Sequence, residues 1–141
     1  MAGRHLTIDA TVLDSSVFSH SKLNNFFIDL AKILDMDIIF GPHFKDVELD
    51  PTKLAAVQAG GKFQDEGGTT GFVVISTSHI SIHTWQMRNF FQLDVFSCKD
   101  FDAEKAINFI KENLGVDKAT ICNLIRFDEA NEPAVDRIFS I

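Results

Sequence analysis

Three strand-like runs follow one another in the middle of the chain with only short connections between them. Residues 72–75 read Phe-Val-Val-Ile, residues 77–85 alternate apolar with polar side chains, and residues 90–96 read as another strand. Alternation with a period of two is typical of a half-buried strand. Because consecutive strands joined by short turns pair antiparallel, these runs predict the centre of an antiparallel sheet.

Helical patterns lie on both sides of this centre. Residues 21–34 carry apolar side chains at helical spacing, and either Ser19 or Ser21 is placed to cap the helix. Asp102 is a capping residue for a helix through Leu114, and Gly115 follows as its C-terminal stop. Asp50-Pro51 predicts a further helix start, continued by residues 54–59 and ended by Gly60-Gly61.

The remaining segments predict additional strands and a loop. We expect strands at residues 6–12 and 119–127, a short buried strand at 38–40 ended by Gly41-Pro42, and a polar loop at 62–70. The tail after Asp128 is polar until Ile138-Phe139.

This order of elements predicts one α+β domain over residues 1–141. The expected architecture is a two-layer sandwich, a mainly antiparallel sheet with helices on one face. The other face of such a sheet stays exposed unless a partner covers it, which is a physical reason to expect a homodimer.

Composition narrows the class of partner. The net charge is −7, which argues against a nucleic-acid binder. No apolar run is long enough to cross a membrane and no signal peptide is recognised, so we expect a cytoplasmic protein. The two cysteines are expected to be free thiols. Fourteen Phe without any Tyr predict a Phe-rich core, with an apolar ligand site or subunit interface as the alternative.

Reactive side chains are concentrated in residues 77–85. His79, Ser81, His83 and Trp85 share one face of the predicted strand because they are two residues apart. Four residues along a strand separate the histidines by roughly 13 Å, too far to share one metal ion. No Gly-x-Ser-x-Gly motif marks a serine hydrolase. A structural role for the histidines stays open at this point.

Two segments resemble the core motif of the prokaryotic S-adenosylmethionine decarboxylases. They are residues 68–85, which contain Ser78-His-Ile-Ser-Ile-His-Thr-Trp85, and residues 93–98, which end in Cys98. Gly3-Arg4-His5-Leu6 is also similar to the start of that family. The resemblance extends from about residue 3 to residue 127.

The resemblance implies a self-cleaving decarboxylase with a covalently bound pyruvoyl group derived from Ser78, which forms a Schiff base with the substrate. Cleavage of the Thr77–Ser78 bond gives a β chain, residues 1–77, and an α chain, residues 78–141. His83 matches the histidine that moves protons during processing, and Cys98 matches the proton donor in decarboxylation. Thr70 stands where the family usually has a serine that assists processing. The expected assembly is a homodimer of αβ units without a metal ion.

The chain departs from the family pattern at three places. Thr77 stands where Glu is usual, the segment around Phe63 aligns poorly with the family's adenine contact, and Met87 replaces the Glu that binds the ribose of S-adenosylmethionine. A missing ribose acceptor costs about 1–3 kcal/mol of binding.

These departures leave the substrate open. S-adenosylmethionine is the first expectation, in polyamine biosynthesis. Arginine or ornithine is the alternative, with Asp65, Glu66 or Asp94 available to bind a cationic group. An unprocessed, non-catalytic homologue that serves as a binding subunit is the second alternative.

Overall fold

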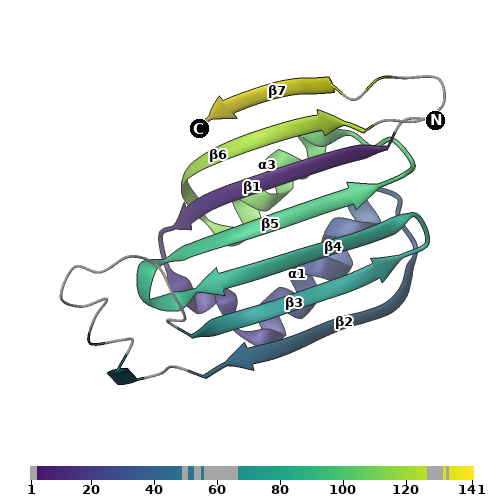
Figure 1. Ribbon diagram of the computed structural model, residues 1–141. Helices are drawn as coiled ribbons and strands as arrows, with labels where there is room; N and C mark the ends of the chain where they lie inside the picture. Colours follow the sequence, from purple (N-terminus) through teal and green to yellow (C-terminus); the bar gives the residue numbers. More distant parts are fainter. Residues whose placement is uncertain (1–2, 49–50, 53–54, 56–66, 127–131, 133) are drawn as a thin grey trace.

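A single antiparallel sheet of seven strands organises the chain. The computed structural model describes residues 3–48, 51–52, 55, 67–126, 132 and 134–141. The strands lie in the order β2-β3-β4-β5-β1-β6-β7, and each pair of neighbours is antiparallel (Figure 1). Their bounds are β1 Arg4–Val12, β2 Ile38–Val47, β3 Gly68–Ile75, β4 Ser78–Trp85, β5 Phe90–Ser97, β6 Val116–Ile125 and β7 Ala134–Ser140.

Helices α1 (His20–Ile33) and α3 (Ala103–Leu114) lie on the same face of this sheet (Figure 1). The Ser19 hydroxyl caps α1 by accepting the Lys22 N–H, and the Asp102 carboxylate caps α3 by accepting the Lys105 N–H. Gly115 ends α3 in the left-handed conformation, at a φ of 62°. Short 3-10 helices, η1 (Ser15–Phe18) and η2 (Gln86–Arg88), complete the described elements.

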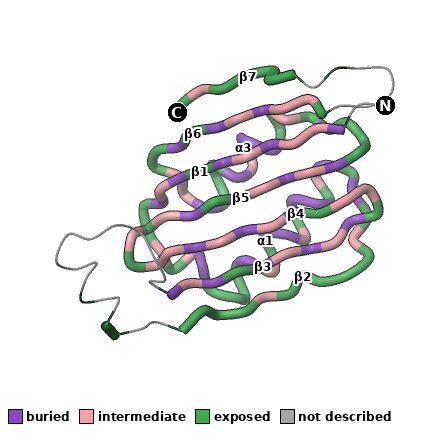
Figure 2. The backbone as a smooth tube through the Cα atoms, in the orientation of Figure 1, coloured by how far each residue is buried: buried purple, intermediate pink, exposed green. Residues whose placement is uncertain are grey.

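The core lies between the sheet and the helices. Along β4 the residues Ile80, Ile82 and Thr84 are buried while the residues between them are not, which is the alternation that Figure 2 shows across the sheet. Phe18, Phe27 and Phe91 are among the largest fully buried side chains, although Phe40 is 58% exposed. Phe side chains therefore lie both in the core and on the surface.

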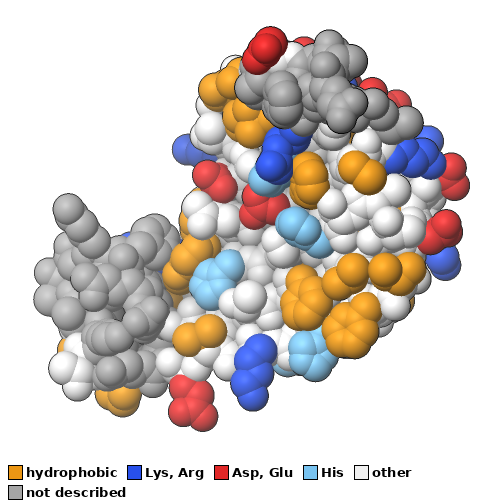
Figure 3. All heavy atoms as spheres, turned by 45° about the vertical axis from the view of Figure 1, so that its right-hand side comes forward, with side chains coloured by type: hydrophobic (Ala, Val, Ile, Leu, Met, Phe, Trp, Pro, Cys, Tyr) orange, Lys and Arg blue, Asp and Glu red, His pale blue; other side chains and the backbone are white. Residues whose placement is uncertain are grey.

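The opposite face of the sheet is not covered by α1 or α3. It carries a mixture of histidine, acidic and aromatic side chains from the central strands, including His5, His79, His83, Asp94 and Phe96, and Figure 3 shows histidine and hydrophobic side chains gathered there. We call this surface the open face. The predicted two-layer α+β sandwich is confirmed.

Several predicted boundaries are wrong. The strand expected to be short, buried and ended by Gly41-Pro42 is β2, which continues to Val47 and is mostly exposed. Its pairing with β3 shifts register around Gly41-Pro42, and such irregularities are common in the outer strands of a sheet, where β2 lies among the described strands. The expected loop at 62–70 already belongs to β3 from Gly68 onward.

The ends of the chain also differ from expectation. Strand β1 begins at Arg4 and β6 at Val116, earlier than predicted, and residues 134–140 form β7 where a polar tail was expected. Pro51, Thr52 and Ala55 are helical, and the rest of the helix predicted at 51–59 lies outside the described residues. Among the described residues, no helix has the length and apolar character of a membrane span.

Candidate functional site

The predicted cleavage bond lies at the turn between β3 and β4. Ser76 and Thr77 form the turn and Ser78 opens β4, where it is the register partner of Ser97. The φ angle of Ser78 is 148°, a conformation that residues with a side chain rarely adopt. The backbone N–H of Cys98 donates a hydrogen bond to the carbonyl oxygen of Thr77, with 2.9 Å between N and O. The sheet thus brings Thr77, Ser78 and Cys98 together, and we call this group the cleavage half of the site.

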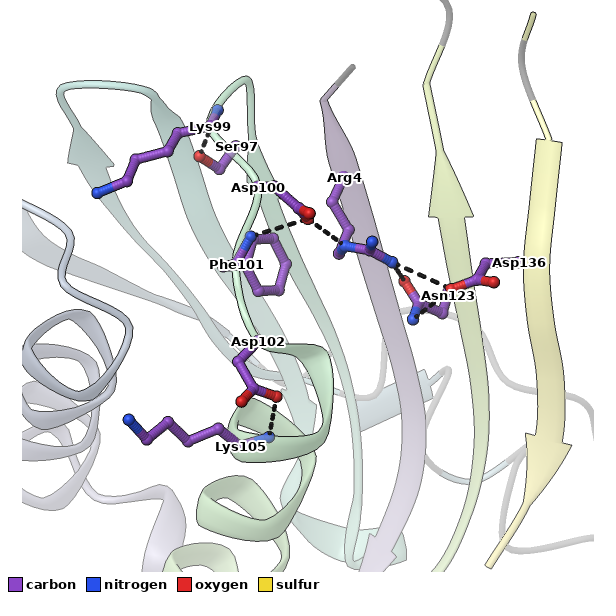
Figure 4. A network of polar contacts seen from close by, with 9 residues as sticks. All are labelled: Arg4, Ser97, Lys99, Asp100, Phe101, Asp102, Lys105, Asn123 and Asp136. Atoms are coloured by element: carbon purple, nitrogen blue, oxygen red, sulfur yellow. Dashed lines mark hydrogen bonds and ion pairs between the residues drawn. The ribbon is translucent and has the colours of Figure 1, made fainter. Parts of the chain in front are cut away.

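Buried Ser97 supports the cleavage half. Its hydroxyl donates to the Thr77 Oγ1 at 2.8 Å and accepts the backbone N–H of Lys99 at 3.0 Å. Figure 4 shows the hydrogen bond between Ser97 and Lys99. Gly3 packs against the bend that follows β5, residues 97–100, which we call the Cys98 turn, since a Cβ there would lie 3.1 Å from the Ser97 carbonyl oxygen and 3.4 Å from the Cys98 Cα. Any larger residue at position 3 would press on the turn that carries Cys98.

Cys98 itself is exposed and free, and Cys122 on β6 is half-buried and free. The expectation of free thiols therefore holds for both. Cys98 is joined to Thr77 through its backbone N–H, and an accessible thiol is chemically able to give up a proton.

The other predicted catalytic residues lie at the far end of the same strand. Thr70 and His83 are register partners on β3 and β4, and the Thr70 Oγ1 is 2.7 Å from the His83 Nδ1. The Trp85 ring lies edge-on to the imidazole, with 4.3 Å between ring centroids. Burial lowers the pKa of His83 below its ordinary value, so the ring favours the neutral state that accepts protons. We call this pair the histidine half.

The two halves do not meet within one chain. Ser78 and His83 are five residues apart on β4, which corresponds to roughly 16 Å along a strand. Each half is assembled by pairing between neighbouring strands, but the sheet holds the halves at opposite ends of β4.

The residues proposed for substrate binding are less well placed. Met87 lies on η2 and is 54% exposed. Asp94 is hydrogen-bonded to His5, with 2.8 Å between Oδ1 and Nε2. Phe63, Asp65 and Glu66 lie outside the described residues.

Sequence reasoning missed two contributors to the cleavage half, Ser97 and Arg4. The side chain of Arg4 bonds Asp100, which follows Cys98 closely in the chain. The resemblance to the family includes Gly3-Arg4-His5, so the sequence did single out Arg4, but it gave no indication of what Arg4 does. Ser97 gave no signal, since its partner Thr77 is distant in sequence. Within the described part of the chain, no group of three or more potential metal ligands gathers.

The arrangement of sheet and helices is shared with a solved structure. The crystal structure of the adenosylmethionine decarboxylase from Aquifex aeolicus superposes with a TM-score of 0.66, covering 93% of this chain and 97% of that one at 22% identity. At this identity the similarity defines the fold class alone.

Sequence comparison is more specific. The S-adenosylmethionine decarboxylase proenzyme of Clostridium botulinum (strain Loch Maree) is 34% identical over 126 residues, which cover 89% of this chain and 94% of the relative. The proenzyme of Pyrococcus furiosus is 28% identical, covering 88% of this chain and 78% of the relative. The model of the S-adenosylmethionine decarboxylase family matches residues 4–127. The chain therefore belongs to this family.

Proposed function

We propose that this protein cuts itself before Ser78 and then decarboxylates S-adenosylmethionine, which yields the aminopropyl donor of polyamine biosynthesis. Membership of the family and the proenzyme names of its relatives support the reaction class. The observation that carries the proposal is the contact between the Cys98 N–H and the Thr77 carbonyl, beside a serine with unusual backbone geometry.

Self-cleavage begins with an acyl shift. The Ser78 Oγ attacks the Thr77 carbonyl carbon, the C–N bond breaks, and an ester links Thr77 to the Ser78 oxygen. Removal of the Ser78 α-proton expels the Thr77 carboxylate. Water then hydrolyses the resulting imine and releases ammonia, which leaves a pyruvoyl group at the new N-terminus.

The cleavage half favours the first step in two ways. The attack places negative charge on the Thr77 carbonyl oxygen, and the Cys98 N–H already donates to that oxygen. Ser78 holds a backbone conformation that a serine rarely adopts, which stores strain next to the bond that breaks.

The second step needs a base for the α-proton. His83 is the candidate because its lowered pKa keeps it neutral and Thr70 orients its ring. A histidine about 16 Å away cannot reach the Ser78 α-proton. We infer that His83 acts on Ser78 of a second copy, so that the proposed homodimer has two sites, each made of one cleavage half and one histidine half.

A face-to-face dimer satisfies this requirement. The twofold axis of such a dimer lies between the two sheets, parallel to them, and runs across β4 at right angles. If it passes midway between Ser78 and His83, each half of the site lies opposite its complement in the other copy. Such an axis passes next to Ser81 on the open face, and the dimer would cover the histidine and aromatic side chains exposed there.

The pyruvoyl group, when formed, withdraws electrons from the bound amine and so stabilises the charge left by loss of CO₂. Residues of the described chain fit such a group at position 78. It would stand at the N-terminus of the α chain, close to Cys98, whose backbone N–H bonds Thr77 and whose exposed thiol we assign as the proton donor to the substrate.

S-adenosylmethionine is the substrate that the family supports. The alternative, arginine or ornithine, requires carboxylates free to bind a second cationic group. Of the three candidate carboxylates, Asp94 already has a partner, since its Oδ1 lies 2.8 Å from the His5 Nε2. Met87 does not supply the ribose acceptor, so the adenosyl group must be bound by other residues.

Denaturing mass spectrometry and a CO₂-release assay test the proposal together. We expect two chains split before Ser78, with a pyruvoyl group on the α chain, and CO₂ from S-adenosylmethionine. A single uncut chain would support the non-catalytic homologue instead. CO₂ from arginine or ornithine but not from S-adenosylmethionine would show that the substrate is wrong.

A further inference from the structure

Arg4 occupies the centre of a polar cluster that reaches from the Cys98 turn to the last strand (Figure 4). Its Nε donates to the Asp100 Oδ1 at 2.6 Å. Its Nη1 donates to the Asn123 Oδ1 at 2.9 Å and to the Asp136 Oδ2 at 3.2 Å. The Arg4 side chain is 15% exposed, so this guanidinium is held mainly by protein groups.

Asp100 links this cluster to the cleavage half. It lies two residues after Cys98, and the same Oδ1 that bonds Arg4 accepts the backbone N–H of Phe101 at 2.9 Å. Ser97 anchors the other end of the turn through Thr77 and Lys99. The Cys98 N–H is therefore aimed at the Thr77 carbonyl by contacts on both sides of it.

Asp136 brings the C-terminal strand into the cluster. It lies on β7, beyond residues 4–127 that the family model matches. Asn123 joins it, since its Nδ2 donates to the Asp136 Oδ2 at 3.4 Å. The hydrogen bond and the charge of Arg4 lower the pKa of Asp100, which keeps this carboxylate ionised.

We propose that Arg4 is a positioning residue for the Cys98 turn and that Asp136 of β7 fixes the direction of its guanidinium. The consequence is that a strand outside the matched family region tunes self-cleavage. This inference rests on the proposed function for its effect on cleavage, but the effect on the Cys98 turn is independent of it.

The geometry of the guanidinium is essential to this role. Its planar fork donates from Nε toward Asp100 and from Nη1 toward Asn123 and Asp136. A lysine ammonium keeps the charge but is a single point that cannot span both sides. Arg4→Lys should therefore behave much like Arg4→Gln, whereas a merely electrostatic role predicts that Lys suffices.

The experiment compares freshly synthesised chains in a cell-free system. Cleavage is followed over time for Arg4→Lys, Arg4→Gln, Asp136→Ala, and Asp136→Ala combined with Arg4→Gln. The control is Glu104→Gln, which removes the exposed 3.5 Å ion pair of Arg137 on β7 with α3 and leaves Arg4 untouched. Thermal melts check folding, and Asp136→Asn is the milder variant if Asp136→Ala melts early.

A second readout does not need cleavage. In a Ser78→Ala, Cys122→Ser background, Cys98 is the single cysteine, and its rate of alkylation by iodoacetamide reports the turn. We expect Arg4→Gln and Arg4→Lys to change the alkylation rate of Cys98 at least about threefold. The reason is that each variant loses a charge-assisted hydrogen bond that holds the turn.

We expect cleavage to slow about tenfold in both Arg4 variants and about threefold in Asp136→Ala. Asp136→Ala should add nothing once Arg4 is Gln, because it acts through Arg4. The inference would be overturned if Asp136→Ala slowed cleavage about threefold further in the Arg4→Gln background. It would also be overturned if Arg4→Lys were cleaved and alkylated at the wild-type rates. An uncut wild-type chain refutes the proposed function, and the alkylation rates then decide on the positioning role alone.

Discussion

The two halves of the site differ in how they are built, although both involve β4. The cleavage half depends on the backbone: a turn, an unusual φ at Ser78 and an N–H aimed at the Thr77 carbonyl. The histidine half depends on side chains, a 2.7 Å contact between Thr70 and His83 on the open face. The cleavage half lies where β4 begins and β5 ends, and the histidine half lies on the open face near the other end of β4.

This difference separates the chemistry into two requirements. In the proposed mechanism, the acyl shift uses groups that a single chain already brings together. Removal of the Ser78 α-proton would use His83 as the base, which the same chain holds about 16 Å away. Variants of each half should therefore stop the reaction at different stages.

Ser78→Ala has the largest expected effect, a complete loss of cleavage, because the attacking oxygen is gone. The fold should persist, since the side chain contributes little to the core. Denaturing mass spectrometry checks the uncut mass, with Ser81→Ala on the same strand as the control. A cleaved Ser78→Ala chain would refute the mechanism.

His83→Ala should slow formation of the pyruvoyl group by about 10²–10⁴-fold, the usual contribution of a general base. Because the acyl shift does not need this base, the ester should accumulate at an unchanged mass. Hydroxylamine, which cleaves esters but spares amides, would then split the chain before Ser78. His79→Ala is the matched control, a histidine on the same face of β4. Resistance of His83→Ala to hydroxylamine would place His83 in the first step instead.

Thr70→Val should slow the same step about fivefold to tenfold, because one hydrogen bond that orients His83 is lost. Thr70→Ser keeps the hydroxyl and should stay close to the wild-type rate. The comparison is a time course of cleavage at one pH. Equal rates for Val and Ser would show that Thr70 does not orient the histidine.

The pH profile should show the smallest effect. Since burial lowers the pKa of His83, the ring stays mostly neutral at pH about 6.5, where an ordinary histidine is half protonated. Cleavage should fall only several-fold as the pH drops below that value. Stability should also decrease there, because the unfolded chain binds the proton first. A cleavage midpoint at or above about pH 6.5 would contradict the lowered pKa.

The sequence predicts those parts of the fold that local signals specify. The caps at Ser19 and Asp102, the stop at Gly115 and the alternation along β4 act through neighbours in the chain. Strand β7 escaped prediction because it is specified by pairing with β6, across a register shift between Asn123 and Leu124. Strand β2 passes Gly41-Pro42 for a similar reason, since its pairing with β3 resumes at His43.

The candidate site follows the same division. The resemblance predicts Ser78, His83, Cys98 and Thr70 as one group. A linear motif does not state which of these residues lie close together within one folded chain. Only the register of β3, β4 and β5 separates them into two halves. The supports from Ser97 and Arg4 depend on contacts distant in sequence. The resemblance includes Arg4 but gives it no role, and no local pattern indicates Ser97.

The most direct test of the account mixes two inactive variants. Ser78→Ala retains His83, and His83→Ala retains Ser78, so a dimer of the two contains one complete site. The variants carry different affinity tags and are made together, and pyruvoyl formation on each chain is read by mass spectrometry. We predict that the His83→Ala chain is cleaved in the mixed dimer and not alone, while the Ser78→Ala chain stays intact. An uncut His83→Ala chain in a verified mixed dimer would contradict a site shared between two copies.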